Sequence, residues 1–316
     1  MITAVDCTIV RFDQNKLLPE FFAYYSQDRD YLESVDKEST GTTRKRISRA
    51  RLGQIPIPLL PLQEQHRIVS ILDEAFEAIA TAKANAEKNL RNAREVFESE
   101  LQALFSDRKY GRSTKTIADV CDIISKLVDP REEQYQEFFH IGAGNIESKT
   151  GEISDVKTAR EEQLISGKFL FDERTVLYSK IRPYLMKVVR PEFNGLCSAD
   201  VYPLAPKPAL ISRDYLYYLL LTPAFTEYAI KGSARAGMPK VNREHLFAYE
   251  FPLPSLQEQE RATEKLDALA DETKNLAGIY ERKIAALDEL KKSLLHRAFT
   301  GKLTANKTEQ LVGAVA

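Results

Sequence analysis

A short basic segment of this chain carries the kinds of side chain that contact phosphates and base edges. Residues 39–51 read STGTTRKRISRAR, in which cations and hydroxyl groups are interleaved and no acidic residue occurs. The side chains suited to such contacts are those of Thr42, Thr43, Arg44, Lys45, Arg46 and Arg49. Arginine and lysine bind phosphate oxygens and guanine edges, and hydroxyls bind either phosphate or base. The segment therefore predicts contact with DNA, and a solvated loop is the alternative interpretation.

Two other segments also gather cations and small polar side chains, although the second contains Glu244. Residues 178–187 read YSKIRPYLMK, and residues 233–245 read SARAGMPKVNREH. The candidate DNA-binding side chains in them are Lys180, Arg182, Arg235, Lys240, Asn242 and Arg243. The formal net charge of the whole chain, −1, neither demands nor excludes a nucleic-acid partner, so the local clustering of cations in these segments is the informative feature. We expect the three segments to supply the DNA-binding surface.

No residues with the spacing of a known catalytic or metal site accompany these segments. Gly142-Ala143-Gly144 lacks the third glycine of a dinucleotide-binding loop, so a turn is the better interpretation. The four histidines and three cysteines never fall at zinc-ligand spacing. Asp129, Glu147 and Lys149 could form a nuclease-like set, but such sets are frequent in charged sequence. The prediction is a chain that catalyses nothing and binds no metal or cofactor itself.

An internal repeat relates the two halves of the chain. Residues 58–67 read PLLPLQEQHR, and residues 252–261, which lie 194 positions later, read PLPSLQEQER. The same ungapped offset pairs Tyr24 with Tyr218, Arg49 with Arg243, Leu72 with Leu266 and Phe105 with Phe299. It relates roughly residues 6–106 to residues 200–300, and it aligns two of the basic segments. A repeat of this length predicts two related modules rather than a solenoid.

Each module ends in a segment with the pattern of a long amphipathic helix, residues 61–106 and 255–300. The second begins with the capping box Ser255-Leu256-Gln257-Glu258 and is free of proline. Apolar residues recur in both at spacings of three and four, which predicts that the helices pair as a coiled coil. The residues predicted to form the contact are Leu72, Ala82, Ala86, Leu266, Leu276 and Leu287. The alternative is that each helix lies on its own domain.

The rest of the sequence indicates two globular domains and a tail. Residues 107–254 contain β-favouring runs such as Val176-Leu177-Tyr178, separated by turn residues, and a helical stretch near residues 211–231. Residues 1–60 form the shorter domain, and residues 301–316 form the tail. The expected fold class is α+β.

Bulk composition favours a cytoplasmic protein. No apolar run approaches the length of a membrane span, and the N-terminus lacks the basic start and apolar stretch of a signal peptide. Three dispersed cysteines favour a reducing compartment over a disulfide framework.

The order of these features resembles the specificity subunit of type I restriction–modification enzymes. The resemblance is carried by VLYSKIRPYLMKVVRPEFNGLCSADVYP, a Gly-Met-Pro-Lys-Val-Asn loop, PLPSLQEQ, GTTRKRISRARL and IPIPLLPLQEQHRIVSILD. It implies two target-recognition domains, each reading one half of a bipartite site in double-stranded DNA. It also implies two antiparallel helices that separate these domains and dock two methyltransferase (modification) subunits. Restriction (nuclease and translocase) subunits would join through the complex, in which the other subunits would use S-adenosylmethionine, ATP and Mg²⁺.

The sequence departs from this family pattern at its start. Nothing before residue 6 corresponds to residues 107–199, so we expect a partial first recognition domain whose sheet lacks strands and leaves open edges. The alternative to a DNA reader is a truncated or half specificity subunit. Such a subunit would act as a coiled-coil assembly scaffold, or another chain would complete it.

Overall fold

The chain forms two compact units, each of which contains part of both long helices. The computed structural model describes residues 7–106, 113–124, 126–233 and 238–303. Unit 1 consists of Met1–Ala93 with Asn275–Ala316, and unit 2 consists of Arg94–Lys274. The two units divide within the long helices, between Ala93 and Arg94 and between Lys274 and Asn275, and the domain boundaries expected at the helix ends stay a prediction.

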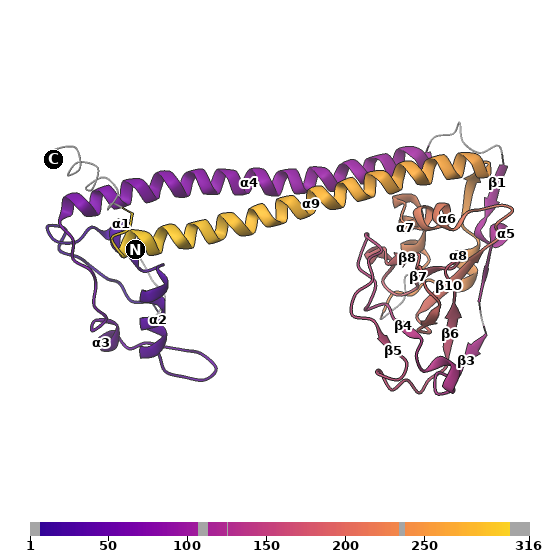
Figure 1. Ribbon diagram of the computed structural model, residues 1–316, viewed down its shortest axis with the longest axis horizontal. Helices are drawn as coiled ribbons and strands as arrows, with labels where there is room; N and C mark the ends of the chain where they lie inside the picture. Colours follow the sequence, from indigo (N-terminus) through magenta and orange to yellow (C-terminus); the bar gives the residue numbers. More distant parts are fainter. Residues whose placement is uncertain (1–6, 107–112, 125, 234–237, 304–316) are drawn as a thin grey trace, which may run out of the picture. The chain divides into compact units, whose positions relative to one another are not determined.

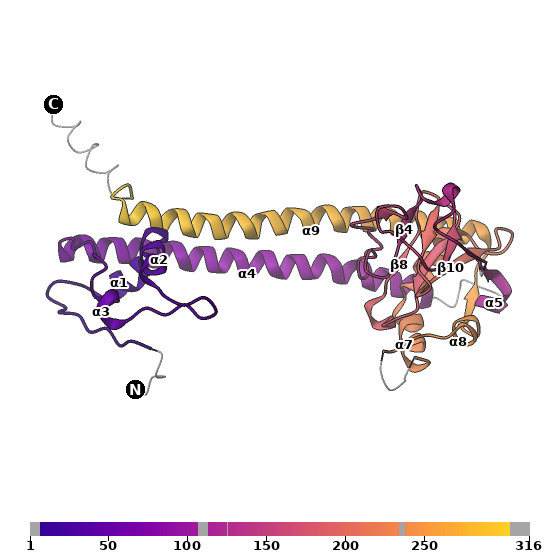
Figure 2. The ribbon, with the colours of Figure 1, turned by 90° about the horizontal axis from the view of Figure 1, so that it is seen from below.

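The two long helices run side by side in opposite directions within each unit (Figures 1 and 2). They are α4, Leu62–Ser106, and α9, Leu256–Phe299. In unit 1 the Lys83 ammonium lies 2.8 Å from the Asp288 carboxylate, and in unit 2 Lys265 forms an ion pair with Glu100. The predicted pairing of the helices is confirmed.

The predicted capping box fixes where α9 begins. The backbone N–H and hydroxyl of Ser255 donate to the Glu258 carboxylate at 2.9 and 2.7 Å. In return, the Glu258 N–H donates to the Ser255 hydroxyl at 3.4 Å. These bonds satisfy N–H groups that have no partner within the first turn of a helix.

Unit 1 adds three short helices to the helix ends: α1, Pro19–Tyr25; α2, Arg29–Glu38; and α3, Arg49–Leu52. Its buried core consists of Leu17, Phe21, Ile68, Leu72, Leu295 and Ala298. Residues from the start of α4 and the end of α9 thus close this core together with α1.

The open sheet expected for the N-terminal part is not what the structure has. Within residues 7–106, β pairing is limited to one bridge between Thr40 and Arg46. Residues 56–59 align with a strand of unit 2 but lie unpaired in the described part of unit 1. A strand needs a partner for its backbone N–H and C=O groups, so this segment stays irregular. Ile57 of this segment is partly buried against the core of unit 1, whereas Leu59 is 64% exposed.

Unit 2 contains the β structure. Its strands are β1, Ser113–Thr116; β2, Cys121–Ile123; β3, Leu127–Val128; β4, Phe139–Ile141; β5, Lys157–Thr158; β6, Lys168–Phe171; β7, Val176–Ser179; β8, Val188–Val189; β9, Gly195–Cys197; β10, Val201–Pro206; and β11, Glu250–Leu253. They form three sheets, in the orders β1-β11, β2-β10-β7-β8 and β3-β6-β9-β4-β5. Every pairing is antiparallel except that between β4 and β9. The expected α+β class is confirmed.

Short helices pack against these sheets. They are α5, Ile117–Val120; α6, Arg213–Leu220; α7, Pro223–Lys231; and α8, Arg243–Phe247; with 3₁₀ turns at Glu133–Tyr135 and Pro183–Leu185. The helical stretch expected near 211–231 is divided into α6 and α7. Thr222 caps α7 and Pro223 occupies its first turn, where proline needs no N–H partner. Buried side chains of α6, including Tyr215 and Leu216, form the main core with Leu101 and Leu266 of the long helices.

The sequence repeat is also a structural repeat. Under the 194-residue offset, the start of α6 falls on that of α1, and the start of α7 on that of α2. The same holds for α8 with α3 and for α9 with α4. Each module therefore provides three short helices followed by one long helix.

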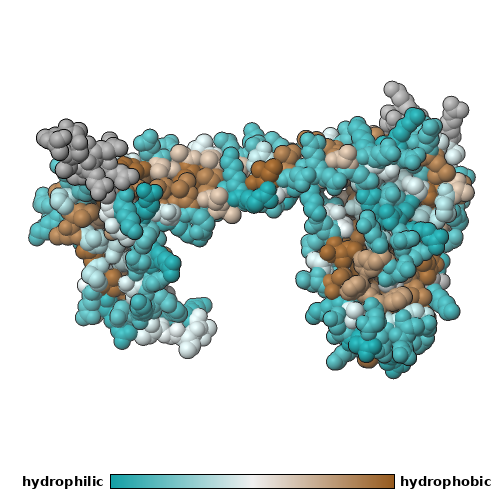
Figure 3. Space-filling model, viewed as in Figure 1, coloured by the Kyte–Doolittle hydropathy of each residue, from teal (hydrophilic) through white to brown (hydrophobic). Residues whose placement is uncertain are grey.

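Burial along the helices matches the predicted contact residues unevenly. Leu72, Leu266 and Ala86 are buried, whereas Ala82 and Leu287 are half-buried. Leu276 departs from the prediction, because 37% of its surface is exposed. Two paired helices cover only a narrow seam, and the fully buried leucines lie where a globular part covers them as well. Apolar side chains consequently remain visible along the helices (Figure 3).

Ala86 is the position where the helix contact is most sensitive to size. Replacement by leucine is expected to lower the free energy of unfolding by about 1–3 kcal/mol, because a packed site has no room for three more carbons. Ala82→Leu is the matched control, since Ala82 lines an open depression and should cost below about 0.5 kcal/mol. Urea unfolding followed by circular dichroism measures both. Equal effects of the two variants would show that Ala86 is not a close-contact position.

Candidate nucleic-acid interface

Two basic segments of unit 2, distant in sequence, lie together on its surface. Ile181 and Lys240 form an antiparallel bridge. The Arg182 N–H donates to the Pro239 carbonyl at 2.9 Å, and the Val241 N–H donates to the Lys180 carbonyl at 2.8 Å. We call Lys180, Arg182, Lys240 and Arg243 the basic surface of unit 2. Backbone pairing thus holds four of the sequence-predicted cations in one region.

An aspartate that the sequence analysis did not single out organises this surface. Lys240 lies 3.1 Å and Lys180 lies 3.8 Å from the Asp200 carboxylate. The Lys180 ammonium also lies 5.3 Å from the centre of the Tyr202 ring, within cation–π range. Burial, with a contribution from Asp200, raises the pKa of Tyr202 against the opposing effect of Arg243. One carboxylate therefore balances two lysines, while the arginines make no ion pair within the described residues.

The arginines have different settings. Arg182 is exposed and has a left-handed backbone conformation, with φ of 50°, at the start of the 3₁₀ turn Pro183–Leu185. Arg243 is exposed in the first turn of α8, with its guanidinium 5.5 Å from the centre of the Phe247 ring. Met238 and Tyr184 are also exposed, on the two paired segments. The surface thus combines cations with flat and apolar side chains, which can contact phosphates and bases respectively.

Asn242 has a structural role that the sequence analysis missed. Its side-chain oxygen accepts a hydrogen bond from the His245 N–H at 2.7 Å and caps α8. Ser48 caps α3 at the equivalent position of the repeat, accepting from the Arg51 N–H at 3.3 Å. The repeat contained the signal, because both residue types favour helix N-caps. Arg235 lies outside the described residues.

Unit 1 presents its basic segment as a loop. Thr40 and Arg46 exchange two backbone hydrogen bonds, of 2.8 and 2.9 Å, and residues 41–45 form the turn between them. The predicted DNA-binding residues there, Thr42, Thr43, Arg44, Lys45 and Arg46, are all exposed, as is Arg49 at the start of α3. Lys45 forms an ion pair with Asp36. Under the 194-residue offset, Arg46 of this loop corresponds to Lys240, which forms the bridge to Ile181 in unit 2.

The nuclease-like set is not assembled as a site. Asp129 forms a forked pair with Arg131 at 2.6 Å, and this contact lowers the pKa of Asp129 to about 2. Lys149 forms an ion pair with Glu98 of α4 at 2.6 Å. Gly142-Ala143-Gly144 is a turn in which the Gly142 N–H donates to the Asn145 side chain at 2.9 Å. Glu147 accepts a hydrogen bond from the Ser154 hydroxyl at 3.4 Å, so the three side chains of the set each have a partner outside it.

A buried glutamine anchors each module to its long helix, and it explains why LQEQ occurs twice. In unit 2 the Ser212 N–H donates to Gln259 Oε1 at 2.9 Å. Gln259 Nε2 donates to the carbonyls of Leu210 and Pro254 at 2.9 and 3.0 Å. In unit 1 Gln65 makes the three equivalent bonds, to Leu18, Lys16 and Leu60, at 2.7–2.8 Å. Both glutamine side chains are fully buried.

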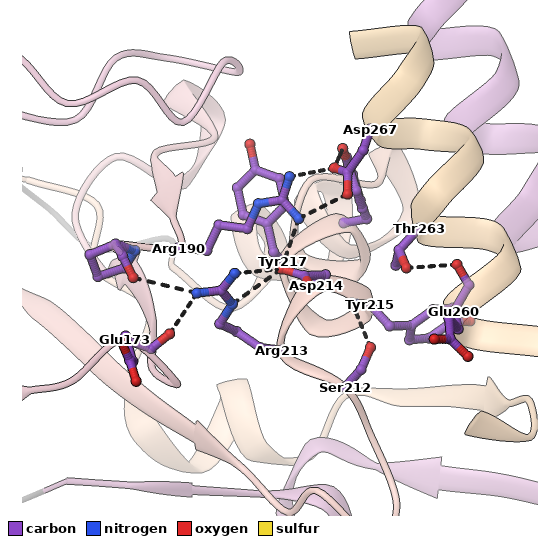
Figure 4. A network of polar contacts seen from close by, with 12 residues as sticks. Glu173, Arg190, Ser212, Arg213, Asp214, Tyr215, Tyr217, Glu260, Thr263 and Asp267 are labelled. Carbon is purple, nitrogen blue, oxygen red and sulfur yellow. Dashed lines mark hydrogen bonds and ion pairs between the residues drawn. The ribbon is translucent and has the colours of Figure 1, made fainter. Parts of the chain in front are cut away.

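An ion-pair network fastens the sheets of unit 2 to α9 (Figure 4). The Arg190 guanidinium lies 2.8 Å from the Asp214 carboxylate and pairs with Asp267 of α9. It also lies 4.8 Å from the centre of the Tyr217 ring. The Tyr218 hydroxyl donates to Asp267 at 2.6 Å, as that of Tyr24 does to Asp73 in unit 1. The network connects the segment after β8, and α6, to α9 within unit 2.

A family model described as "Type I restriction modification DNA specificity domain" matches residues 1–90 and 111–282. The match covers most of the chain. The chain belongs to the type I restriction–modification DNA specificity family. The duplicated architecture and the anchoring of each module on a long helix are therefore those of a DNA specificity domain.

Known members of this family are similar over most of the present chain. The chain is 31% identical over 276 residues to the type I restriction enzyme EcoDI specificity subunit of Escherichia coli. It is 22% identical over 319 positions to the MjaVIII specificity subunit of Methanocaldococcus jannaschii. The first alignment covers 86% of this chain and 60% of the relative, and the second covers 94% and 73%. The chain thus spans about three fifths of the length of the EcoDI subunit.

Solved structures share the fold. One is a chain from a study described as "Structural basis underlying complex assembly and conformational transition of the type I R-M system", with a TM-score of 0.75. Another is the HsdS subunit from Thermoanaerobacter tengcongensis, with a TM-score of 0.56. Sequence identities are 18% and 19%, and the matches cover 93% of this DNA specificity chain and 74% and 73% of the other chains.

None of the helices described in the present chain has the length and apolar character needed to cross a membrane.

Proposed function

We propose that this chain is the non-catalytic DNA specificity subunit of a cytoplasmic type I restriction–modification complex. The basic surface of unit 2 would read one half of a bipartite site in double-stranded DNA, and the Thr42–Arg49 segment of unit 1 would contact the other half. The observation that carries the proposal is the backbone pairing of residues 180–182 with residues 239–241. It brings cations from two separate segments into one surface.

The charges of this surface suit DNA. Arg182 and Arg243 project fixed charges that can bind a phosphate or the edge of a guanine. Lys180 and Lys240 are held by Asp200, which also restrains their side chains before binding. Pre-ordered side chains lose less conformational entropy when they bind. Because the surface includes both phosphate-binding and base-reading side-chain types, it can both position DNA and select a sequence.

Docking of two modification subunits along the long helices is part of the same proposal. Leu276, Ile279 and Leu290 of α9 are 37%, 50% and 46% exposed. Their spacings of three and eleven residues place them on nearly the same side of a helix with 3.6 residues per turn. An exposed apolar stripe of this kind is typical of a surface that another protein covers. Restriction subunits would join through the modification subunits.

Removal of two cations should separate DNA reading from folding. Lys240→Ala with Arg243→Ala is expected to weaken DNA binding by the complex with its modification subunits, without changing assembly. Loss of a base contact costs about 1–3 kcal/mol, whereas loss of a phosphate contact lowers the salt slope by about one. The measurement is affinity for a duplex selected from a random library, at several salt concentrations.

Two further variants make this test specific. Arg174→Ala is the matched control, because Arg174 is exposed in the β6–β7 turn and pairs with Asp172. Asp200→Asn should act in the opposite direction, since it leaves Lys180 and Lys240 uncompensated and should raise affinity at low salt. The proposal would be contradicted if the Lys240→Ala, Arg243→Ala double variant and the Asp200→Asn variant bound duplex DNA as tightly as the unaltered complex and the Arg174→Ala control. Such a result would favour an assembly scaffold without DNA readout.

A further inference from the structure

Unit 1 contains a buried carboxylate oxygen without a hydrogen-bond donor. Asp28 caps α2, where its Oδ2 accepts the Asp30 N–H at 3.2 Å. Its Oδ1 has no hydrogen-bond partner in the described chain, although the side chain is only 3% exposed. A buried carboxylate oxygen in this state is costly unless a cation or donor compensates it. The position therefore calls for a positively charged partner.

Two further ligand atoms face this oxygen. His296, in the last turn of α9, places Nδ1 4.0 Å from Asp28 Oδ1 and 3.9 Å from Asp30 Oδ2. One ligand atom from each residue lies within 4.8 Å of the other two. These separations exceed hydrogen-bond lengths, so the three atoms surround a common point without bonding one another.

The geometry needs only small movements to hold a metal ion. Ligands about 2.0–2.1 Å from a tetrahedral zinc ion are about 3.3 Å apart. That is closer by roughly 0.6 Å than His296 Nδ1 now lies to either carboxylate oxygen. The side chains of Asp30 and His296 are 64% and 48% exposed and can rotate, whereas Asp28 is fixed by burial and by its capping bond.

The repeat supplies an internal comparison. Under the 194-residue offset, Asp28, Asp30 and His296 correspond to Thr222, Ala224 and Gln102 of unit 2. Thr222 is equally buried, but its hydroxyl donates to the Leu219 carbonyl at 2.7 Å and accepts the Phe225 N–H at 3.2 Å. The module therefore folds without ionisable groups at these positions, and their presence in unit 1 has another reason.

We infer that Asp28, Asp30 and His296 form a binding site for a divalent transition metal ion, specifically Zn²⁺. An imidazole nitrogen with two carboxylates suits such an ion better than Mg²⁺ or Ca²⁺, which prefer oxygen ligands alone. Water would complete the coordination. The ion joins the start of α2 to the end of α9 and so clamps the core of unit 1. A search for zinc-ligand spacing in the sequence does not find this site, because His296 lies more than 260 residues after Asp30.

The test uses the full-length chain, stripped of metal with a chelator that is then removed. Titration with Zn²⁺ against a chromophoric competitor should reveal one site, and Co²⁺ should give visible absorption bands. At a hundredfold excess of Zn²⁺ over Kd, the Tm of unit 1 should rise by about 10 °C. His296→Gln should weaken this site at least about 100-fold. His66→Gln, a change at an exposed histidine of α4, is the matched control and should leave it intact.

A second variant guards against misfolding. The combination Asp28→Thr, Asp30→Ala and His296→Gln copies the side chains of unit 2, and it should fold while losing both the zinc site and the rise in Tm. Equal zinc binding by this variant and the unaltered chain would overturn the inference. A rise in Tm with Ca²⁺ or Mg²⁺ but not with Zn²⁺ would overturn the assigned class of ion.

Discussion

Replacement of Gln259 by leucine is expected to lower the free energy of unfolding of unit 2 by about 3–5 kcal/mol. Leucine has a similar volume, so packing changes little. The Ser212 N–H and the carbonyls of Leu210 and Pro254 lose the buried glutamine side chain that satisfies them, the carbonyl of Pro254 in a fully buried bond and the other two groups in partly buried ones. Each buried backbone group without a partner costs about 1–3 kcal/mol. The loss is large because one side chain satisfies three groups.

Hydrogen–deuterium exchange of the full chain measures this effect where it occurs. Amides of α6 and of the first turns of α9 should exchange faster in Gln259→Leu than in the unaltered chain. Gln257→Leu is the matched control, because Gln257 is exposed two residues earlier on the same helix. Gln65→Leu should have the same effect in unit 1 without altering unit 2. If Gln257→Leu cost as much as Gln259→Leu, the buried hydrogen bonds would not be the cause.

Replacement of Arg190 by methionine is expected to cost about 2–3 kcal/mol and to loosen the sheets of unit 2 from α9. Breaking a buried ion pair costs about 3–5 kcal/mol because the remaining charges lose their compensation. Here the side chains of Asp214 and Asp267 are 36% and 40% exposed, so solvent reduces that cost. The stack of the guanidinium on Tyr217 is lost as well.

A lysine at this position should not restore stability. An ammonium is a single point charge, whereas the guanidinium of Arg190 reaches two carboxylates and also lies over the Tyr217 ring. Urea unfolding of Arg190→Lys should therefore resemble that of Arg190→Met more than that of the unaltered chain. Arg174→Met, at an arginine whose side chain is 81% exposed, is the control and should change stability by less than about 0.5 kcal/mol. Full rescue by lysine would show that charge alone matters there.

The sequence predicts local and periodic features of this fold well. The offset that pairs Leu72 with Leu266 also pairs α4 with α9, which begin at equivalent positions and have nearly the same length. A repeated sequence pattern thus specifies a repeated structure. The capping box at Ser255 marks the first turn of α9, since its bonds lie within four residues. In contrast, Leu276 belongs to a regular stripe but is exposed, because periodicity does not reveal how wide a surface the partner helix covers.

The candidate site is predicted in part, for a related reason. Lys180, Arg182, Lys240 and Arg243 stand out by charge, but their proximity depends on pairing between segments nearly sixty residues apart in sequence. Asp200 and Arg190 have no signal of their own, because their partners come from distant elements. The side-chain type of Asn242 predicts DNA contact, whereas its alignment with Ser48 in the repeat indicates a helix cap.

The contact between Phe21 and Phe299 sets an order of events during synthesis. The two rings pack edge to face with their centres 5.3 Å apart, although nearly the whole sequence separates them. At about 5–20 residues per second, a ribosome adds Phe299 roughly 15–55 s after Phe21. Unit 2 is one continuous stretch, Arg94–Lys274, and can close its core earlier. The core of unit 1 therefore cannot close during synthesis until the last turns of α9 have left the ribosome. Until then Phe21 and Leu72 lack their contacts with Leu295 and Ala298.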